Sequence, residues 1–171
     1  MDFRCRSIAI CCCFIRADSW HGLWKNSVVA ATKSQYSQYV TALQLFRGEY
    51  GTYPTIFDGH SQLNISTYPE SEQFIEALSG RTIDGDRSVQ YGNHRGIQFY
   101  SFSEQELTVS KDLGYQQIVD RMGNTNIVVC IDHDNDGFVE VVEDGELKQI
   151  RTSVTIYTIP TEGEQAIRLW D

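Results

Sequence analysis

Apolar side chains between residues 26 and 50 recur at spacings of three, four and seven, the period of an amphipathic α-helix. No proline or glycine interrupts this stretch before Gly48, while Gly51 and Pro54 predict a firm end. We therefore expect one helix of about six or seven turns. Its apolar positions are Val29, Tyr36, Val40, Leu43, Leu45, Phe46 and Tyr50, and its exposed positions are Lys33, Ser34, Gln38 and Gln44.

A second, shorter helix is predicted from Pro69 to Gly80. Pro69 suits the first turn, because its fixed φ matches a helix and its missing N–H needs no partner there. Gly80 suits the end. Phe74, Ile75 and Leu78 form the stripe that this helix is expected to bury.

The last third of the chain has strand character. Residues 126–131, 138–142 and 147–159 are rich in Val, Ile, Tyr and Thr, and turn-forming residues separate them. Asp144-Gly145 is a strong signal for a two-residue hairpin. These runs predict an antiparallel meander of three strands covered on one side by the long helix, which is an α+β fold.

The first nineteen residues differ from the remainder. The longest apolar run, Ile8 to Ile15, is far shorter than the roughly 20 residues that cross a bilayer as a helix. Arg4 and Arg6 precede it and Ala17 follows, which is the order of a secretory signal. A leader without a targeting role is the other interpretation. We expect residues 1–19 to be a leader or signal-like segment and residues 20–171 to be one globular domain.

Charge is uneven along the chain, whose formal net charge is −9. Residues 1–50 carry 6 basic and 3 acidic side chains, whereas residues 51–171 carry 8 and 20. Because so acidic a body repels phosphate backbones, nucleic acid is not expected as a partner.

Motifs for catalysis are missing from the sequence. It contains no nucleophile elbow, phosphate-binding glycine loop or zinc-protease motif, and its four histidines are scattered. Asp84 with Asp86, and Glu104 with Glu106, are interpreted as surface acids. Cys130 lies in an apolar run, which favours a buried, inert thiol. We expect no enzyme activity.

Residues 132–143 match the string of a twelve-residue calcium loop, with Asp at the first, third and fifth positions and Gly137 at the sixth. If residues 138–142 form a strand, Glu143 lies too far along the chain to reach the ion. The expected ligands are the side chains of Asp132, Asp134 and Asp136 and the carbonyl of Phe138, with Ca²⁺ as the ion because every donor is oxygen. A solvated Asp/Asn/Gly turn is the alternative. Calcium is slightly favoured because two acids would make the turn and the third has no local use.

Several short motifs carry a family resemblance. They are the helix end Leu43–Pro54, the segment Asn93–Phe99, the Asp-Arg-Met-Gly-Asn sequence at 120–124, and the end from Val154 to Trp170. Together they resemble the periplasmic part of type IV pilin-like proteins, and more narrowly the G-type pseudopilins of type II secretion systems. The resemblance covers roughly residues 25–171, and the family's apolar N-terminal span is not recognisable in residues 1–25.

The resemblance implies a non-catalytic structural subunit that assembles through its long helix. Its partners would be other pseudopilins or secretion-system subunits, in the periplasm or cell envelope. Anchoring in the inner membrane is expected only if the true N-terminus differs from the one given. The alternative is an exported, soluble calcium-binding or adhesive module that has a pilin-like fold without the filament.

Overall fold

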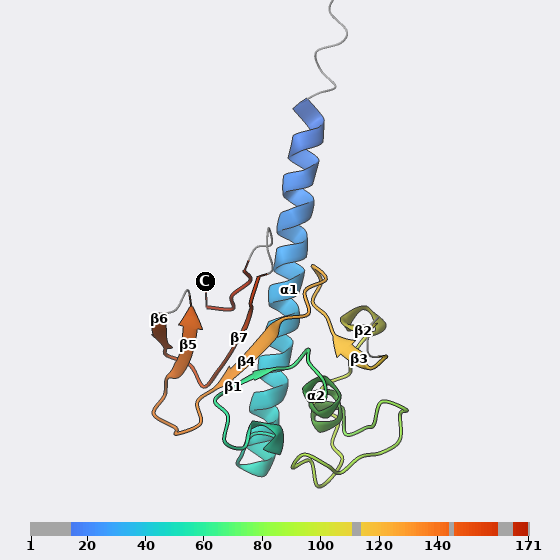
Figure 1. The fold of residues 1–171 in the computed structure, drawn as a ribbon, viewed down its shortest axis with the longest axis vertical. Helices are drawn as coiled ribbons and strands as arrows, with labels where there is room; N and C mark the ends of the chain where they lie inside the picture. The colour runs from blue at the N-terminus through green and yellow to red at the C-terminus, as the bar shows by residue number, and fades with distance from the viewer. Residues whose placement is uncertain (1–14, 111–113, 144–145, 161–165, 171) are drawn as a thin grey trace, which may run out of the picture.

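A computed structural model describes the backbone of residues 15–110, 114–143, 146–160 and 166–170. It describes the side chains of the same residues except 15–23 and 143. It has a long helix, a short helix and small antiparallel sheets (Figure 1). The elements are α1 (Ile15–Tyr50), η1 (Thr55–Phe57), β1 (Gln62–Asn64), α2 (Glu70–Ser79), η2 (Glu104–Glu106), β2 (Leu107–Val109), β3 (Gln116–Ile118), β4 (Ile127–Ile131), β5 (Val139–Glu143), β6 (Glu146–Ile150) and β7 (Val154–Thr158). The expected α+β class is confirmed at this level.

Helix α1 is longer than the apolar pattern predicted, because it begins at Ile15 and not near Asn26. From Val29 onward it packs in the folded head, whereas the turns before Val29 stand clear of the other described elements (Figure 1). Tyr36, Tyr39 and Phe46 are fully buried, but Leu45 is exposed, contrary to expectation. Residues 1–14 of the expected leader lie outside the described residues, and residues 15–19 belong to α1.

Helix α2 agrees with the sequence prediction. Pro69 precedes its first residue, and Gly80 ends it in the left-handed conformation with φ of +64°. Phe74, Ile75 and Leu78 are all buried. Gly80 is needed for a second reason, because a Cβ there would lie 2.7 Å from the carbonyl carbon of Gly96.

The central sheet has the strand order β1-β4-β7, and both pairings are antiparallel. All five residues of β4 are buried. Ile127, Val129 and Ile131 join the core formed with α1, whereas Val128 and Cys130 pack on the other side with Val139 and Val141 of β5. The sheet is therefore covered by α1 on one face and by the β5–β6 hairpin on the other.

This arrangement contradicts the predicted three-stranded meander. Strands β5 and β6 form their own two-stranded sheet, and β1, which was not predicted, pairs with β4. The run 147–159 is divided into β6 and β7 by bends at residues 151–153. The physical reason is burial, since folding the hairpin over β4 covers Val128 and Cys130, which would face solvent in a flat meander.

Among the described residues, we find no helix with the length and apolar content that crossing a membrane requires.

Candidate functional site

The acidic loop between β4 and β5 brings three predicted residues together. One carboxylate oxygen from each of Asp132, Asp134 and Asp136 lies within 4.8 Å of the other two. Asp132 is buried, whereas Asp134 and Asp136 are exposed. The fourth predicted ligand is the carbonyl of Phe138, and its ligand role stays a prediction. Glu143 is the last residue of strand β5, the extended segment that was expected to keep it away from the ion.

Backbone N–H groups of the loop donate hydrogen bonds to these carboxylates. Asp132 accepts from the N–H groups of Asp136 at 3.2 Å and Gly137 at 3.1 Å. Asp134 accepts from Asp136 at 3.4 Å, and Asp136 accepts from Phe138 at 2.8 Å. The expectation that one acid has no local use is therefore wrong, because each of the three helps to form the turn.

Two residues of the loop have the left-handed backbone conformation that lets it close. Asn135 has φ of +62° and Gly137 has φ of +88°. The N–H of Asp132 donates to the carbonyl of Ser153, which fixes the start of the loop to the segment before β7. The loop therefore holds three carboxylates close together, an arrangement that a hard cation or water can complete.

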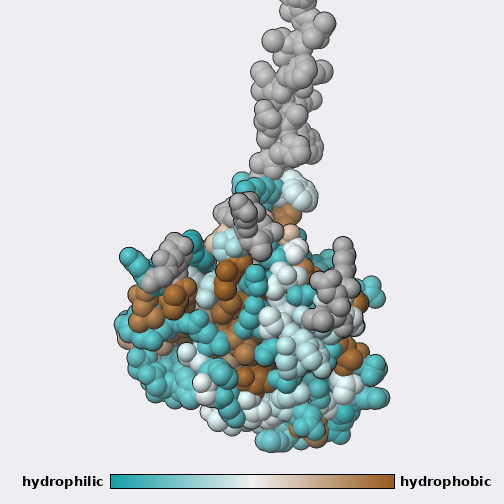
Figure 2. All heavy atoms as spheres, in the orientation of Figure 1, coloured by the Kyte–Doolittle hydropathy of each residue, from teal (hydrophilic) through white to brown (hydrophobic). Residues whose placement is uncertain are grey.

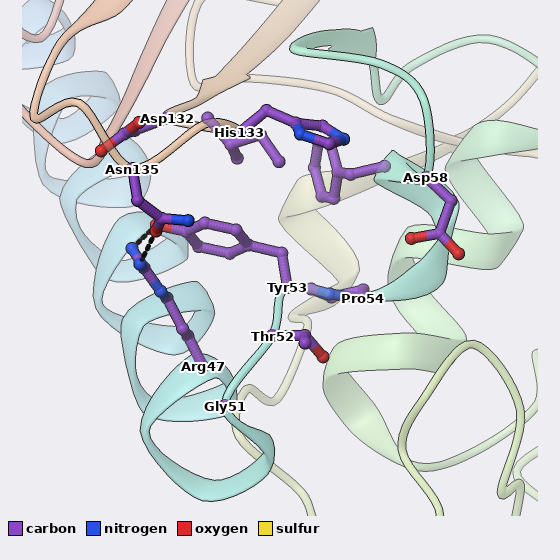
Figure 3. Close-up of a pocket in the computed structure, with 11 residues that line it drawn as sticks. Arg47, Gly51, Thr52, Tyr53, Pro54, Asp58, Asp132, His133 and Asn135 are labelled. Atoms are coloured by element: carbon purple, nitrogen blue, oxygen red, sulfur yellow. Dashed lines mark hydrogen bonds between the residues drawn. The ribbon is translucent and has the colours of Figure 1, made fainter.

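Arg47, in the last turn of α1, joins the loop to the helix (Figure 3). Its guanidinium donates to the side-chain oxygen of Asn135 and, at 3.1 Å, to the hydroxyl of Tyr53. The same group lies 5.0 Å from the centre of the Tyr53 ring, within the range of a cation–π contact. Sequence reasoning missed this contact, because no local spacing indicates a pair 88 residues apart.

The chain reverses beside this contact as the sequence suggested. Gly51 has φ of +78°, and its N–H donates to the carbonyl of Arg47 at 2.8 Å. The Tyr53 hydroxyl then donates to the carbonyl of Ser153 at 3.0 Å. An open pocket of about 180 Å³ lies beside the loop. Its polar lining residues are drawn in Figure 3 and include Arg47, Asp58, Asp132, His133 and Asn135. His133 is exposed.

A second polar cluster surrounds Asp120, in the segment that carries the family resemblance. Oδ1 of Asp120 accepts from the N–H groups of Met122 at 2.7 Å and Asn124 at 2.9 Å. Oδ2 accepts from the Asn124 side chain and from the hydroxyl of Tyr36. Gly123 has φ of +89°. These contacts give Asp120, Gly123 and Asn124 a structural role, in which they shape and hold this turn.

The interpretation of Glu106 as a surface acid is wrong. Only 2% of its area is exposed. It accepts from the Tyr100 hydroxyl at 2.7 Å and from the N–H of Ser103 at 2.8 Å, with Arg121 at 3.7 Å. The spacing of Ser103 and Glu106 is that of a capping box, a signal that the sequence contained.

The free thiol of Cys130 is buried, and burial raises its pKa to about 12. It is therefore protonated at neutral pH and poorly suited to act as a nucleophile. Of the residues that the structure describes, the aspartates of the acidic loop are the group of ligand-type side chains close enough to hold a metal.

Searches against protein-family models, curated proteins and solved structures found no match to this chain.

Proposed function

We propose that this chain is a non-catalytic structural subunit of pilin-like type, which assembles through α1 with copies of itself or with related pseudopilin or secretion-system subunits in the cell envelope. The observation that carries the proposal is the division of α1. From Val29 to Tyr50 it contributes to the core of the head, while the turns before Val29 project (Figure 1). A helix that protrudes from a head presents a surface on which a partner can pack.

Exposed apolar side chains on α1 support this role. Trp24, on the projecting part, is 69% exposed, and Leu45 lies exposed lower on the same helix. Large apolar side chains in water are favourable binding positions, because burying each one contributes about 1.5–3 kcal/mol. The motifs at Leu43–Pro54 and 120–124 add the family resemblance, and both determine local folding in the structure.

The test is site-specific photo-crosslinking in the cells that make the protein. A photoreactive amino acid at position 24 should form adducts with further copies or with related envelope subunits. The matched control carries the same group at Asp86, which is exposed and belongs to a turn closed by a Thr82–Asp86 hydrogen bond, not to α1. Equal adduct patterns from the two positions, or a freely diffusing protein without adducts, would reject assembly through α1.

The second candidate is an exported, soluble calcium-binding or adhesive module, and the cluster of Asp132, Asp134 and Asp136 favours it. Calcium would also suit the structural subunit, since it would rigidify the loop that Arg47 ties to α1. Fractionation separates the two candidates. Recovery of the whole protein as a soluble, unassembled species would favour the module, and recovery in envelope assemblies would favour the subunit.

A further inference from the structure

The hairpin of β5 and β6 is a two-stranded sheet, so each of its strands has an edge with which no other described strand pairs. In the part of the chain that the structure describes, β6 pairs with β5 alone. Figure 1 shows the hairpin at the side of the molecule, with β6 outermost. Residues 146–149 are all exposed. A strand edge of five residues with which no described strand pairs can add another strand, and natural proteins usually protect such an edge.

An apolar pair lies on the outer face of this hairpin. Val142 and Leu147 stand opposite each other in the register, and they are 52% and 62% exposed. The hydrophobic colouring in Figure 2 marks this side of the head. The inward positions Val139 and Val141 are already buried against β4, so Val142 and Leu147 are not needed for the core of the monomer.

Charges on β6 select one mode of self-pairing. Residues directly opposite in a sheet share a face, so a two-fold antiparallel pairing of β6 with itself must centre on one residue. A centre at Glu146 or Lys148 places like charges opposite each other. A centre at Leu147 places Glu146 of each copy opposite Lys148 of the other, which makes two favourable cross-strand pairs. A centre at Gln149 or Ile150 does not pair these two charges with each other.

We propose that β6 is a self-association edge, at which a second copy of this chain pairs antiparallel about Leu147. The two hairpins then form one four-stranded sheet in the order β5-β6-β6-β5. Val142 and Leu147 of both copies form a continuous apolar row on one face, and the two Glu146–Lys148 pairs lie on the other. This contact uses no residue of α1 and is therefore independent of the assembly proposed above.

The test is sedimentation equilibrium of the full chain and of charge variants. The unmodified chain should show a monomer–dimer equilibrium. Glu146→Lys and Lys148→Glu should each weaken it about tenfold, because both cross-strand pairs become repulsive. The double variant Glu146→Lys/Lys148→Glu should restore it. An equimolar mixture of the two single variants should form a heterodimer, since the opposite charges then face each other again.

Asp86→Lys makes the same charge change as Glu146→Lys, in a loop away from the hairpin, and should leave the dimer unaffected. Circular dichroism of each variant shows that the monomer is folded. A monomeric unmodified chain at millimolar concentration overturns the proposal. Equal weakening by Asp86→Lys, or no rescue in the double variant and the mixture, overturns it as well. Self-association that persists unchanged in both single variants assigns the contact to another surface.

Discussion

The hydroxyl of Tyr36 on α1 donates a hydrogen bond of 3.0 Å to the carboxylate of Asp120, 84 residues later in the chain. Both residues are buried. This bond connects the middle of the long helix to the turn before β4, since Asp120 also accepts from two backbone N–H groups of that turn. This carboxylate therefore ties α1 to the turn before β4, beside the hydrophobic core that packs the helix on the sheet.

Asp120→Ala should lower the free energy of unfolding by about 3–5 kcal/mol, because several buried donors lose their acceptor together. Tyr36→Phe should cost less, about 1.5–3 kcal/mol, since the turn keeps its carboxylate. Urea denaturation measures both variants. Tyr115→Phe, at a half-buried tyrosine, is the matched control, and a loss as large as that of Tyr36→Phe would contradict the assigned bond.

Alkaline pH should unfold the protein through its buried tyrosines. Burial, and then the charge of Asp120, raises the pKa of Tyr36; burial, and then Glu106, raises the pKa of Tyr39. The phenols stay protonated in the folded state, but the unfolded chain loses these protons above about pH 10. Stability is thus fully present below pH 10 and falls above it, by about 1.4 kcal/mol per pH unit for each such tyrosine. Denaturant titrations from pH 8 to 11 measure the slope, which Tyr36→Phe should reduce.

Calcium should raise the melting temperature if the acidic loop binds it. A hundredfold excess of Ca²⁺ over its dissociation constant corresponds to about 2.7 kcal/mol. Asp134→Asn keeps an oxygen that can accept the N–H of Asp136 but removes one charge, so it should reduce the calcium response. Differential scanning calorimetry in chelator and in millimolar Ca²⁺ measures the response, with Asp86→Asn as the control. Identical curves in both buffers would leave the loop as a hydrogen-bonded turn.

Arg47→Gln should loosen the acidic loop, because it removes the guanidinium that contacts Asn135 and Tyr53. We expect faster amide hydrogen exchange in residues 132–137 and a loss of about 1 kcal/mol in stability. Arg95→Gln removes an arginine from an exposed ion pair with Glu49 and should leave the loop unchanged. Equal exchange rates in the two variants would show that Arg47 does not hold the loop.

Gly80→Ala should destabilise the head by more than about 2 kcal/mol. Its backbone has positive φ, and the new methyl group would meet the backbone of Gly96. Gly59→Ala is the matched control, because Gly59 has φ of +80° with no atom within 4 Å of the added Cβ. It should cost about 1 kcal/mol from the backbone alone. Thermal melts that do not separate the two variants would argue against the close approach at Gly80.

The sequence predicted best what short-range chemistry determines. Pro69 and Gly80 marked the ends of α2 correctly, and the apolar stripe of Phe74, Ile75 and Leu78 is the buried one. The aspartates of the acidic loop were expected to converge, and they do. Each of these features depends on residues within about one or two turns of each other.

Pairing between residues far apart in the sequence could not be predicted from local patterns. Strand β1 is only three residues long, and it is a strand because it pairs with β4. The strand pattern of residues 126–159 was visible, but whether the hairpin extends the sheet or folds over it depends on what covers Val128 and Cys130. The contact of Arg47 with Asn135 likewise follows from the tertiary fold.

The order in which the sheet is completed matters during synthesis on the ribosome. Strand β4 pairs with β1, which is synthesised earlier, and with β7, which is synthesised later. Ile167 is synthesised later still, and it exchanges hydrogen bonds with Thr158 of β7. A nascent chain that has emerged only to residue 150 thus leaves one edge of β4 open and part of the α1 surface uncovered. Such an intermediate exposes apolar surface and an open strand edge, and it is therefore prone to misassociation and proteolysis until β7 is added.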